Sequence, residues 1–285
     1  MRTCIRQPIY PRINANSPYA KSLVMAYCPT DITSCDLVSR NNMRWYTNTI
    51  EPSSPVIMSN GKVGRAILST HDYARFDTEY NPIAATDSVT ICAWAKDLVG
   101  AGDQHGRTFF ARGKDGNGNG WSLSLGSDAS SLKRAIFGVV WTSPSLVGRV
   151  LNSFVPLTTG RWIIGRYTQG VSLSMFFEGA EPVHDTTSVG TSLRTSTLGL
   201  GFHGGVANGF NDYSLLSWYG LLGDVFVWNR ALSDKECLGF LDNPFQIYQE
   251  REFLYTGNGS GNYTPLIVSE TGGNNPDPKD CFLSP

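Results

Sequence analysis

The sequence has few charged residues, few cysteines and no long apolar run. Charged residues make up 16% of the 285 positions, below the roughly 25% of an average soluble protein. The 23 basic and 24 acidic residues leave a formal net charge of −1, which argues against a protein that neutralises nucleic-acid phosphates. No apolar run approaches the ~20 residues that span a membrane. Because no apolar segment follows Arg2 and Arg6, we expect no secretory signal.

The six cysteines are too few and too scattered for a disulfide framework, and they contain no Cys-x-x-Cys pair for zinc. Cys92 lies in a strand pattern and Cys237 in a helix pattern, where cysteine is usually a small buried hydrophobe. A loop-closing bridge between Cys28 and Cys35 stays open. The remaining thiols fit synthesis in a reducing compartment.

Turn-forming and aromatic residues are abundant, with 30 glycines, 15 prolines and 12% aromatics. Strict alternation of apolar and polar residues recurs along the chain, which is typical of half-buried strands. We expect the inter-sheet core to hold Trp94, Trp121, Leu173, Phe177 and Val225. The predicted strands are residues 89–95, 108–111, 121–125, 135–141, 162–167, 171–177, 198–202 and 221–228.

One helix is predicted near residues 233–241. Ser233 and Glu236 have the spacing of a capping box, in which each side chain binds the other residue's backbone N–H. Leu232 and Cys237 flank this box as a hydrophobic staple. Pro244 ends the segment, because proline disfavours helix for the residue before it.

Five segments in order resemble the laminin-G-like, concanavalin A-like jelly-roll family: residues 17–27, 61–67, 88–95, 109–113 and 223–236. The last of these, GDVFVWNRALSDKE, is similar to the family's closing strand and helix and is the most specific. The resemblance implies an all-β fold, a concanavalin A-like jelly-roll sandwich of two antiparallel sheets with one short helix near the C-terminal end. It implies little about function, because this fold carries lectins, glycan-cleaving enzymes and structural modules.

Residues 243–248, NPFQIY, resemble the ending of versions of this domain that bacteriophage proteins carry. We therefore expect a non-enzymatic virion protein with a lectin-like fold on the particle exterior, as a capsid decoration or tail component. It would be made in the host cytoplasm, not secreted, and would form a homo-oligomer in the particle, with no nucleic-acid or membrane partner. The alternative is a carbohydrate-binding module for host-surface glycans.

Catalytic residues are not expected. The paired strand carboxylates of glucanases with this fold are missing, and Asp224 is the one acidic residue inside a strong strand pattern. We interpret Asp224 as a residue that orders a neighbouring loop or the Arg230 side chain. The histidines lie in loop-like stretches, and no Gly-x-Ser-x-Gly motif accompanies them.

Glycan binding is favoured by aromatic and amide side chains close together, because sugars stack on aromatic rings and bond to amides. The alternative role for these aromatic residues is to cap the core. Trp141 joins the group from another predicted loop. The ligand-binding candidates are Trp141, Asn208, Asn211, Asp212, Tyr213 and Trp218.

No cofactor is expected, and calcium is the alternative that stays open. Asp115, Asn117 and Asn119 match the first half of a calcium loop, but the acid that an EF-hand needs eleven positions after Asp115 is Gly126. A Gly/Asn-rich hairpin explains the same residues. Asp103 is a further possible ligand.

The ends of the chain differ in composition from its centre. We expect an N-terminal arm over residues 1–16, the jelly-roll domain over 17–255 and a polar C-terminal tail over 256–285. Both ends carry isolated apolar residues, which suits segments that order against other virion subunits.

Overall fold

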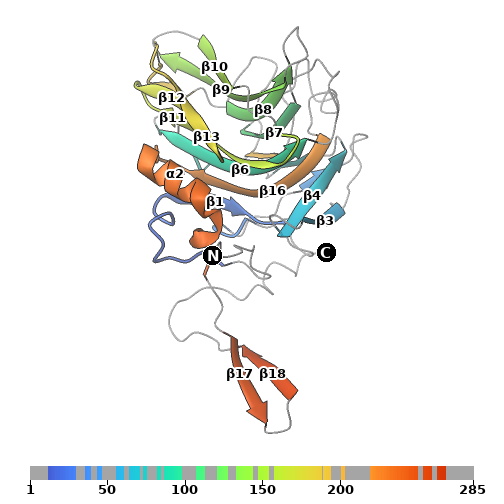
Figure 1. The fold of residues 1–285 in the computed structure, drawn as a ribbon. Coiled ribbons are helices and arrows are strands. Elements are labelled where there is room, and N and C mark those ends of the chain that lie inside the picture. Colours follow the sequence, from blue (N-terminus) through green and yellow to red (C-terminus); the bar gives the residue numbers. More distant parts are fainter. Residues whose placement is uncertain are drawn as a thin grey trace.

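In the computed structural model, the described residues form two stacked sheets, a helical segment and a separate hairpin (Figure 1). The structure describes residues 12–29, 36–39, 44–46, 56–60, 64–70, 73–75, 82–84, 87–97, 107–112, 121–127, 133–143, 147–153, 157–187, 189–193, 200–202, 219–249, 253–258 and 262–267.

The first sheet has eight antiparallel strands in the part of the chain described. Strand β16 (Tyr219–Trp228) lies in its interior, because it pairs with β6, β4 and β1. The strand order is β13 (Ala180–Asp185), β12 (Ser172–Phe177), β11 (Arg161–Thr168), β6 (Val89–Asp97), β16, β4 (Gly64–Thr70) and β3 (Val56–Asn60), with β1 (Leu23–Tyr27) on β16.

The second sheet lies against the first and is also antiparallel (Figure 1). Its described strands run in the order β10 (Val147–Ser153), β9 (Lys133–Ser143), β8 (Trp121–Ser127), β7 (Arg107–Arg112), β15 (Leu200–Phe202), β5 (Tyr73–Arg75) and β2 (Arg44–Tyr46), with β14 (Ser192–Leu193) on β9. The predicted all-β sandwich of two antiparallel sheets is confirmed, and each predicted strand overlaps an observed one.

Helix α2 (Asp234–Asp242) forms where the capping box predicts it. The Ser233 hydroxyl accepts from the Glu236 backbone N–H at 3.2 Å, and the Glu236 carboxylate accepts from the Ser233 N–H at 2.7 Å. The 3-10 helix η1 (Pro244–Ile247) follows directly. Both cover the face of the first sheet that is turned away from the second (Figure 1).

An inner apolar cluster fills the space between the sheets. Gly165 in β11 permits the close approach, since an added Cβ there would lie 2.5 Å from the Phe137 ring of β9. Leu173, Phe177, Val225 and Trp121 lie in this cluster as predicted. Its larger members are Met25, Tyr27, Ile91, Trp121, Leu123, Phe137, Ile163, Tyr167, Leu173, Met175, Phe177 and Val225.

An outer apolar cluster lies on the opposite face of the first sheet, beneath α2, η1 and residues 13–28. The prediction that Trp94 belongs to the inter-sheet core is wrong, because Trp94 is buried in this outer cluster. Strand β6 buries both faces, so Ile91 and Ala93 point inward while Cys92 and Trp94 point outward. The large outer side chains are Tyr19, Trp94, Trp162, Phe176, Phe226, Trp228, Phe240 and Tyr248.

The segment before the first strand of the sandwich contacts the segment after η1. Ile13 forms an isolated bridge with Tyr248, and the Asn14 N–H donates to the Ile247 carbonyl at 2.8 Å. Farther along, β17 (Phe253–Asn258) pairs with β18 (Asn262–Ile267) as a separate two-stranded sheet, drawn apart from the sandwich in Figure 1. This hairpin crosses the boundary expected at residues 255/256, and the domain limits stay predictions.

Candidate functional site

The predicted glycan-binding residues fall where the structure gives little detail. Asn208, Asn211, Asp212, Tyr213 and Trp218 lie outside the described residues. Trp141 belongs to strand β9, so its assignment to a loop is wrong, and its side chain is outside the description. The ligand-binding assignment therefore stays a prediction.

The calcium candidates Asp103, Asp115, Asn117 and Asn119 also lie outside the described residues. Within the described ranges, no group of three or more His, Cys, Asp or Glu side chains is arranged to hold a metal ion. Cys28, Cys92 and Cys237 are buried, and Cys35 lies outside the described residues, so the Cys28–Cys35 bridge stays an open alternative.

A surface hollow of about 320 Å³ lies between α2 and the hairpin that β12 and β13 form. The hairpin turn is Glu178–Gly179, and Gly179 has a φ of +72°, a conformation that glycine adopts without steric cost. Arg161 of β11 fixes the turn, because its Nη1 donates to the Glu178 carbonyl at 2.7 Å. The turn is therefore held in place opposite α2.

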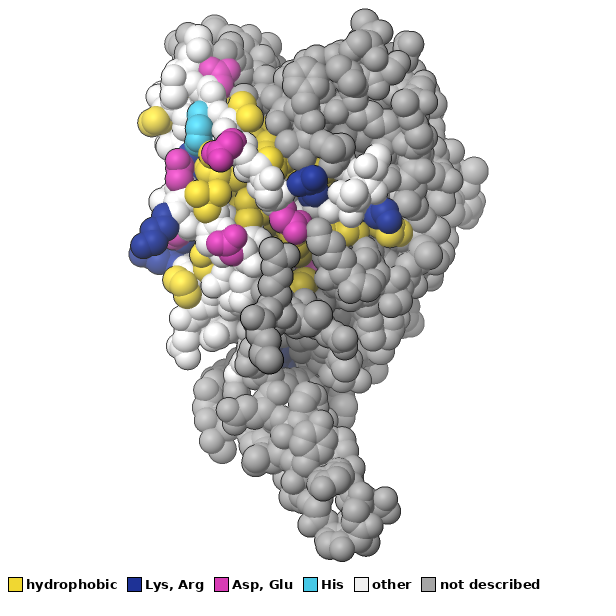
Figure 2. All heavy atoms as spheres, in the orientation of Figure 1, with side chains coloured by type: hydrophobic (Ala, Val, Ile, Leu, Met, Phe, Trp, Pro, Cys, Tyr) yellow, Lys and Arg dark blue, Asp and Glu magenta, His cyan; other side chains and the backbone are white. Residues whose placement is uncertain are grey.

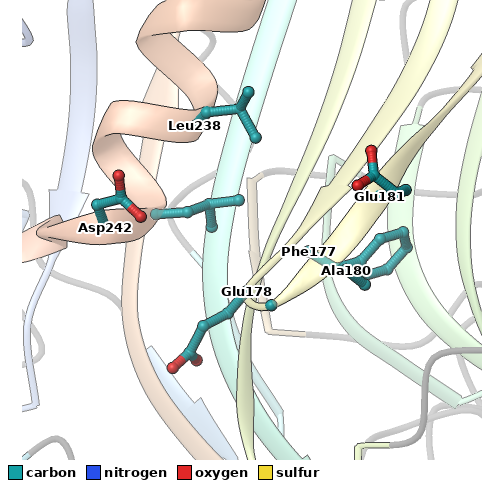
Figure 3. Close-up of a pocket in the computed structure, with 8 residues that line it drawn as sticks. Phe177, Glu178, Ala180, Glu181, Leu238 and Asp242 are labelled. Carbon is teal, nitrogen blue, oxygen red and sulfur yellow. The ribbon is translucent and has the colours of Figure 1, made fainter.

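The hollow combines apolar and acidic side chains. Figure 3 shows Leu238 extending from α2 toward the hairpin, with Asp242 at the end of the helix and Glu178 and Glu181 on the hairpin side. Leu238 is 43% exposed, which is unusual for a large apolar side chain in this part of the chain. Figure 2 shows acidic and hydrophobic side chains next to one another on this face of the molecule.

A polar network lies beside the hollow at the N-terminus of α2. Arg166 is buried, and its guanidinium donates to Asp234 Oδ1 at 2.7 Å, to the Leu232 carbonyl at 2.7 Å and to Ser174 Oγ at 2.9 Å. Its charge also lies 4.9 Å from the centre of the Phe176 ring. Arg166 thereby ties α2 to strands β11 and β12.

His184 completes this network and corrects one sequence interpretation. It lies in strand β13, not in a loop, with Nδ1 2.9 Å from Ser174 Oγ and Nε2 4.0 Å from Asp234 Oδ2. These are the residue types of a catalytic triad, but Ser174 is fully buried and already accepts from Arg166. A substrate cannot reach its hydroxyl, so the arrangement is suited to structure rather than to nucleophilic catalysis.

Two further acidic residues have structural contacts. Asp224 is fully buried and accepts from the Tyr248 hydroxyl at 2.6 Å, so it orders the segment after η1. Burial and this neighbouring carboxylate raise the pKa of Tyr248 well above its ordinary value. Arg230 pairs instead with Glu236, at 2.9 and 3.1 Å. This bidentate contact is the main reason that the pKa of Glu236 falls to about 2.

No helix in the described ranges is long and apolar enough to cross a membrane. A search of curated protein sequences found no match. The family model for the concanavalin A-like lectin/glucanases superfamily matches residues 68–237, more than half of the chain.

Several solved structures have a similar fold at low sequence identity. The binding domain of Paraclostridial Mosquitocidal Protein 1 aligns with a TM-score of 0.58 and 12% identity, over 82% of this chain and 54% of that one. The botulinum neurotoxin serotype D binding domain aligns at 0.54 and 9%, over 78% and 51%. The chain thus spans about half the length of these two proteins.

Domain 4 of AbnA, an extracellular arabinanase from Geobacillus stearothermophilus, aligns with a TM-score of 0.51 and 17% identity. The alignment covers 77% of this chain and 98% of that domain, which was solved with arabinotriose. At these identities the likeness concerns the fold alone.

Proposed function

Because the chain belongs to the concanavalin A-like lectin/glucanases superfamily, we propose that it is a non-enzymatic binding module that recognises carbohydrate. The observation that carries this proposal is the match to a complete domain solved with arabinotriose, which covers 98% of that domain. A jelly-roll sandwich also offers long loops at its ends, where sugar-binding side chains are commonly placed.

The contacts of Asp224 and Glu236 support a structural role for these two acidic residues. A glycosidase needs two carboxyl groups that face a common cleft about 5–10 Å apart. Asp224 is instead buried against Tyr248, and Glu236 is bound to Arg230 and Ser233. The Ser174–His184–Asp234 group is shielded at its hydroxyl.

The sandwich itself limits where a glycan can bind. The outer face of the first sheet is covered by α2, η1 and residues 13–28, and its inner face is in the core. We therefore place the carbohydrate site on the loops or on the second sheet, where the candidates Asn208, Asn211, Asp212, Tyr213 and Trp218 remain. A calcium ion that Asp103 and Asp115 help to hold would order neighbouring loops there.

A glycan array probed with the full chain tests this proposal. We expect selective binding to a small group of glycans, lost in Tyr213→Ala and Trp218→Ala and retained in the matched control Tyr19→Phe, which alters a buried ring of the outer cluster. Repeating the array with a calcium chelator separates a calcium-dependent site from an independent one. An empty array, or release of shortened sugars from a bound glycan, would contradict the proposal.

As the setting of this module we propose the exterior of a bacteriophage particle, as a capsid decoration or tail component. The closing residues 243–248, which resemble phage versions of the domain, support this assignment. In this setting the protein is made in the host cytoplasm, assembles as a homo-oligomer and contacts other virion subunits through its terminal segments.

Truncation of the terminal segments tests the virion assignment. Residues 12–14 contact residues 247–249, so the cuts belong before Arg12 and after Gln249. We expect the remaining 12–249 fragment to fold and to be missing from purified particles, while the full chain is found in them by mass spectrometry and immuno-electron microscopy. Equal incorporation of both would refute a role of the terminal segments in assembly.

A further inference from the structure

The strands of the two sheets differ in the charged residues that they contain. In the first sheet, acidic and basic residues occur in equal number, with Asp97, Glu181, Asp185 and Asp224 against Arg65, Lys96, Arg161 and Arg166. The described strands of the second sheet contain no acidic residue, although the whole chain has a formal net charge of −1. Their basic residues are Arg44, Arg75, Arg107, Arg112, Lys133, Arg134 and Arg149. Counter-charges for these residues therefore come from outside the strands of this sheet.

The register of the strands shows which residues share the distal face of the second sheet, the face turned away from the first sheet (Figure 1). Trp121 and Leu123 belong to the inner cluster, so Ser122 between them lies on the distal face of β8. Directly opposite residues of antiparallel strands share a face. The row of opposite residues through Ser122 crosses the sheet as Val150, Gly138, Ser122, Ala111, Gly201, Arg75 and Arg44.

Two arginines end this row. Arg44 of β2 and Arg75 of β5 occupy directly opposite positions. Such positions lie about 5 Å apart, and like charges at them are destabilising. Because an arginine guanidinium binds a carboxylate through two parallel hydrogen bonds, a carboxylate shared by both arginines would offset this repulsion. The arginine pair therefore favours an anion as its partner.

A pair of tyrosines follows the arginine pair on the same face. Tyr46 of β2 and Tyr73 of β5 are directly opposite one another, two residues along each strand from Arg44 and Arg75. Sugars stack on aromatic rings and form hydrogen bonds with polar groups. Together the two pairs combine residue types that recognise a sugar with a carboxylate.

The rest of the row leaves room for a ligand of several units. From Arg75 it continues through small residues, which are Gly201, Ala111, Ser122 and Gly138. Gly138 is partly exposed, whereas Phe137 and Val139 on either side of it are buried. The distal face is thus open to solvent at this point of β9, and small residues lie between it and the arginines.

We propose that the distal face of the second sheet binds an acidic glycan, with a carboxylate of the glycan at Arg44 and Arg75. This inference rests on the carbohydrate recognition proposed above and specifies the chemical class of the ligand. Tyr46 and Tyr73 provide the rings against which the acidic sugar stacks, and the following sugars lie along the row of small residues. Since charge contributes to the affinity, binding weakens as the salt concentration rises.

Calorimetric titration of the full chain with matched acidic and neutral glycans tests the ligand class. The probes are polygalacturonate and sialyllactose, each in its native form and in a carboxyl-reduced, neutral form. We expect the native forms to bind roughly tenfold more tightly or better at low salt, as for the gain of a charge-assisted contact. This preference should shrink in 1 M salt, where the Debye length is about 3 Å.

The glycan results separate this inference from the proposed function. Binding of neutral glycans without a preference for the native acidic forms would overturn the acidic-glycan assignment and leave carbohydrate recognition in place. Absence of binding to these probes and to the glycan array would overturn both. Double-stranded DNA is the polyanion control, and binding as tight as that of polygalacturonate would show an unselective basic surface and overturn the assignment.

Replacement of the arginine pair tests the location of the site. Arg44→Gln/Arg75→Gln should lower the affinity for the native probes roughly tenfold or more, and Arg44→Lys/Arg75→Lys should be intermediate, because lysine keeps the charge without the planar fork. The matched control Lys21→Gln/Lys235→Gln removes the same charge from two exposed positions outside both sheets and should bind like the parent. An equal loss in this control would show an effect of net charge alone and overturn the site.

Melting temperatures without ligand provide a further readout. Because opposite like charges repel, Arg44→Gln/Arg75→Gln should melt at or above the temperature of the parent. Polygalacturonate should raise the melting temperature of the parent but not that of this variant. A variant that melts far below the parent would show that partners within the chain already hold the two arginines, and would overturn the proposal.

Discussion

The two apolar clusters on opposite faces of the first sheet are built differently. The inner cluster joins two sheets. Most of its side chains are aliphatic, such as Ile91, Ile163 and Leu173, and only a few are aromatic. The outer cluster joins one sheet to a helix and the N-terminal residues, and tryptophan, phenylalanine and tyrosine dominate it. Both lie against the same strands, so their difference reflects what covers each face.

Hydrogen bonds hold the cover of the outer cluster at several points. Trp228 Nε1 donates to the Tyr19 carbonyl at 2.7 Å, and the Thr90 hydroxyl donates to the Arg230 carbonyl at 2.8 Å. Arg166 of β11 donates a hydrogen bond to the Leu232 carbonyl. A helix that covers a sheet is not joined to it by backbone hydrogen bonds between strands. These side-chain hydrogen bonds fix the position of the covering segments instead. In the inner cluster the Tyr167 hydroxyl likewise donates to the Gly190 carbonyl at 2.6 Å, but both walls of that cluster are strand ladders.

The largest expected effect on stability is the loss of either of two adjacent phenylalanines of β12, one in each cluster. Phe177 lies in the inner cluster and Phe176 in the outer one, and both are buried. Phe177→Ala should lower the free energy of unfolding by about 3–5 kcal/mol, and Phe176→Ala by about 3 kcal/mol, because α2 can settle into the space. Urea denaturation measures both. A larger loss for Phe176→Ala would reverse the ranking of the two clusters.

The next largest effect comes from adding one methyl group in each cluster, by replacing a glycine with alanine. In Gly165→Ala the new Cβ lies 2.5 Å from the Phe137 ring and 2.9 Å from Leu123, and we expect a loss of about 3 kcal/mol from overpacking. In Gly239→Ala the new Cβ meets the Tyr19 hydroxyl at 2.9 Å, which can move, and alanine favours the helix by about 1 kcal/mol. Thermal melts should show Gly239→Ala close to the parent; equal losses at both sites would mean that the outer cover is as rigid as the inner core.

A smaller effect concerns the buried polar pair of the outer cluster. Tyr248→Phe removes the 2.6 Å hydrogen bond to the buried Asp224 carboxylate, and should cost about 2 kcal/mol. Tyr19→Phe, in the same cluster, serves as the control and should cost well under half of that. If both variants unfold at the same denaturant concentration, the Asp224 contact does not contribute to holding the cover.

The smallest expected effect is a pH dependence of stability that arises at the start of α2. The folded pKa of Glu236, about 2, is below its ordinary value of 4.5, mainly because Arg230 binds the carboxylate. Its contribution is therefore complete above pH 4.5 and is lost as the pH falls toward 2. The Glu236 side chain is 32% exposed, so solvent screening limits the contribution to about 1 kcal/mol.

The variant Glu236→Gln isolates this carboxylate. Its melting temperature should be below the parent's at pH 7 and should converge with it near pH 2. Phe177→Ala, in the inner cluster, should keep a constant difference over the same range. A difference between Glu236→Gln and the parent that is independent of pH would show that hydrogen-bond geometry, and not charge, stabilises the start of α2.

The sequence was informative where local patterns decide the structure. The alternation in residues 162–167 and 221–228 located strands, and Ser233 with Glu236 located the helix, because capping depends on neighbouring residues. Alternation did not identify the face of Trp94, since both faces of β6 are buried and the pattern carries no direction. The same limit applies to any strand covered on both sides.

The surface features were harder to predict because they join distant segments. The sequence predicts a loop at His184, whereas the structure has a strand there, AEPVHD, which contains a proline and lacks regular alternation. The hollow combines residues 177–181 with residues 238–242, and no local pattern connects them. The predicted binding residues near Asn208 and Asp115 lie outside the described ranges, so sequence composition remains their basis.

The interior position of β16 has a consequence for synthesis on the ribosome. Strands β1, β4 and β6 each need β16 as a neighbour, yet 121 residues separate Asp97 at the end of β6 from Tyr219. At about 5–20 residues per second, those partners wait on the order of ten seconds with unpaired edges. The first sheet therefore assembles late in translation, and a nascent chain stalled before residue 219 would be a natural client for chaperones that shield exposed strands.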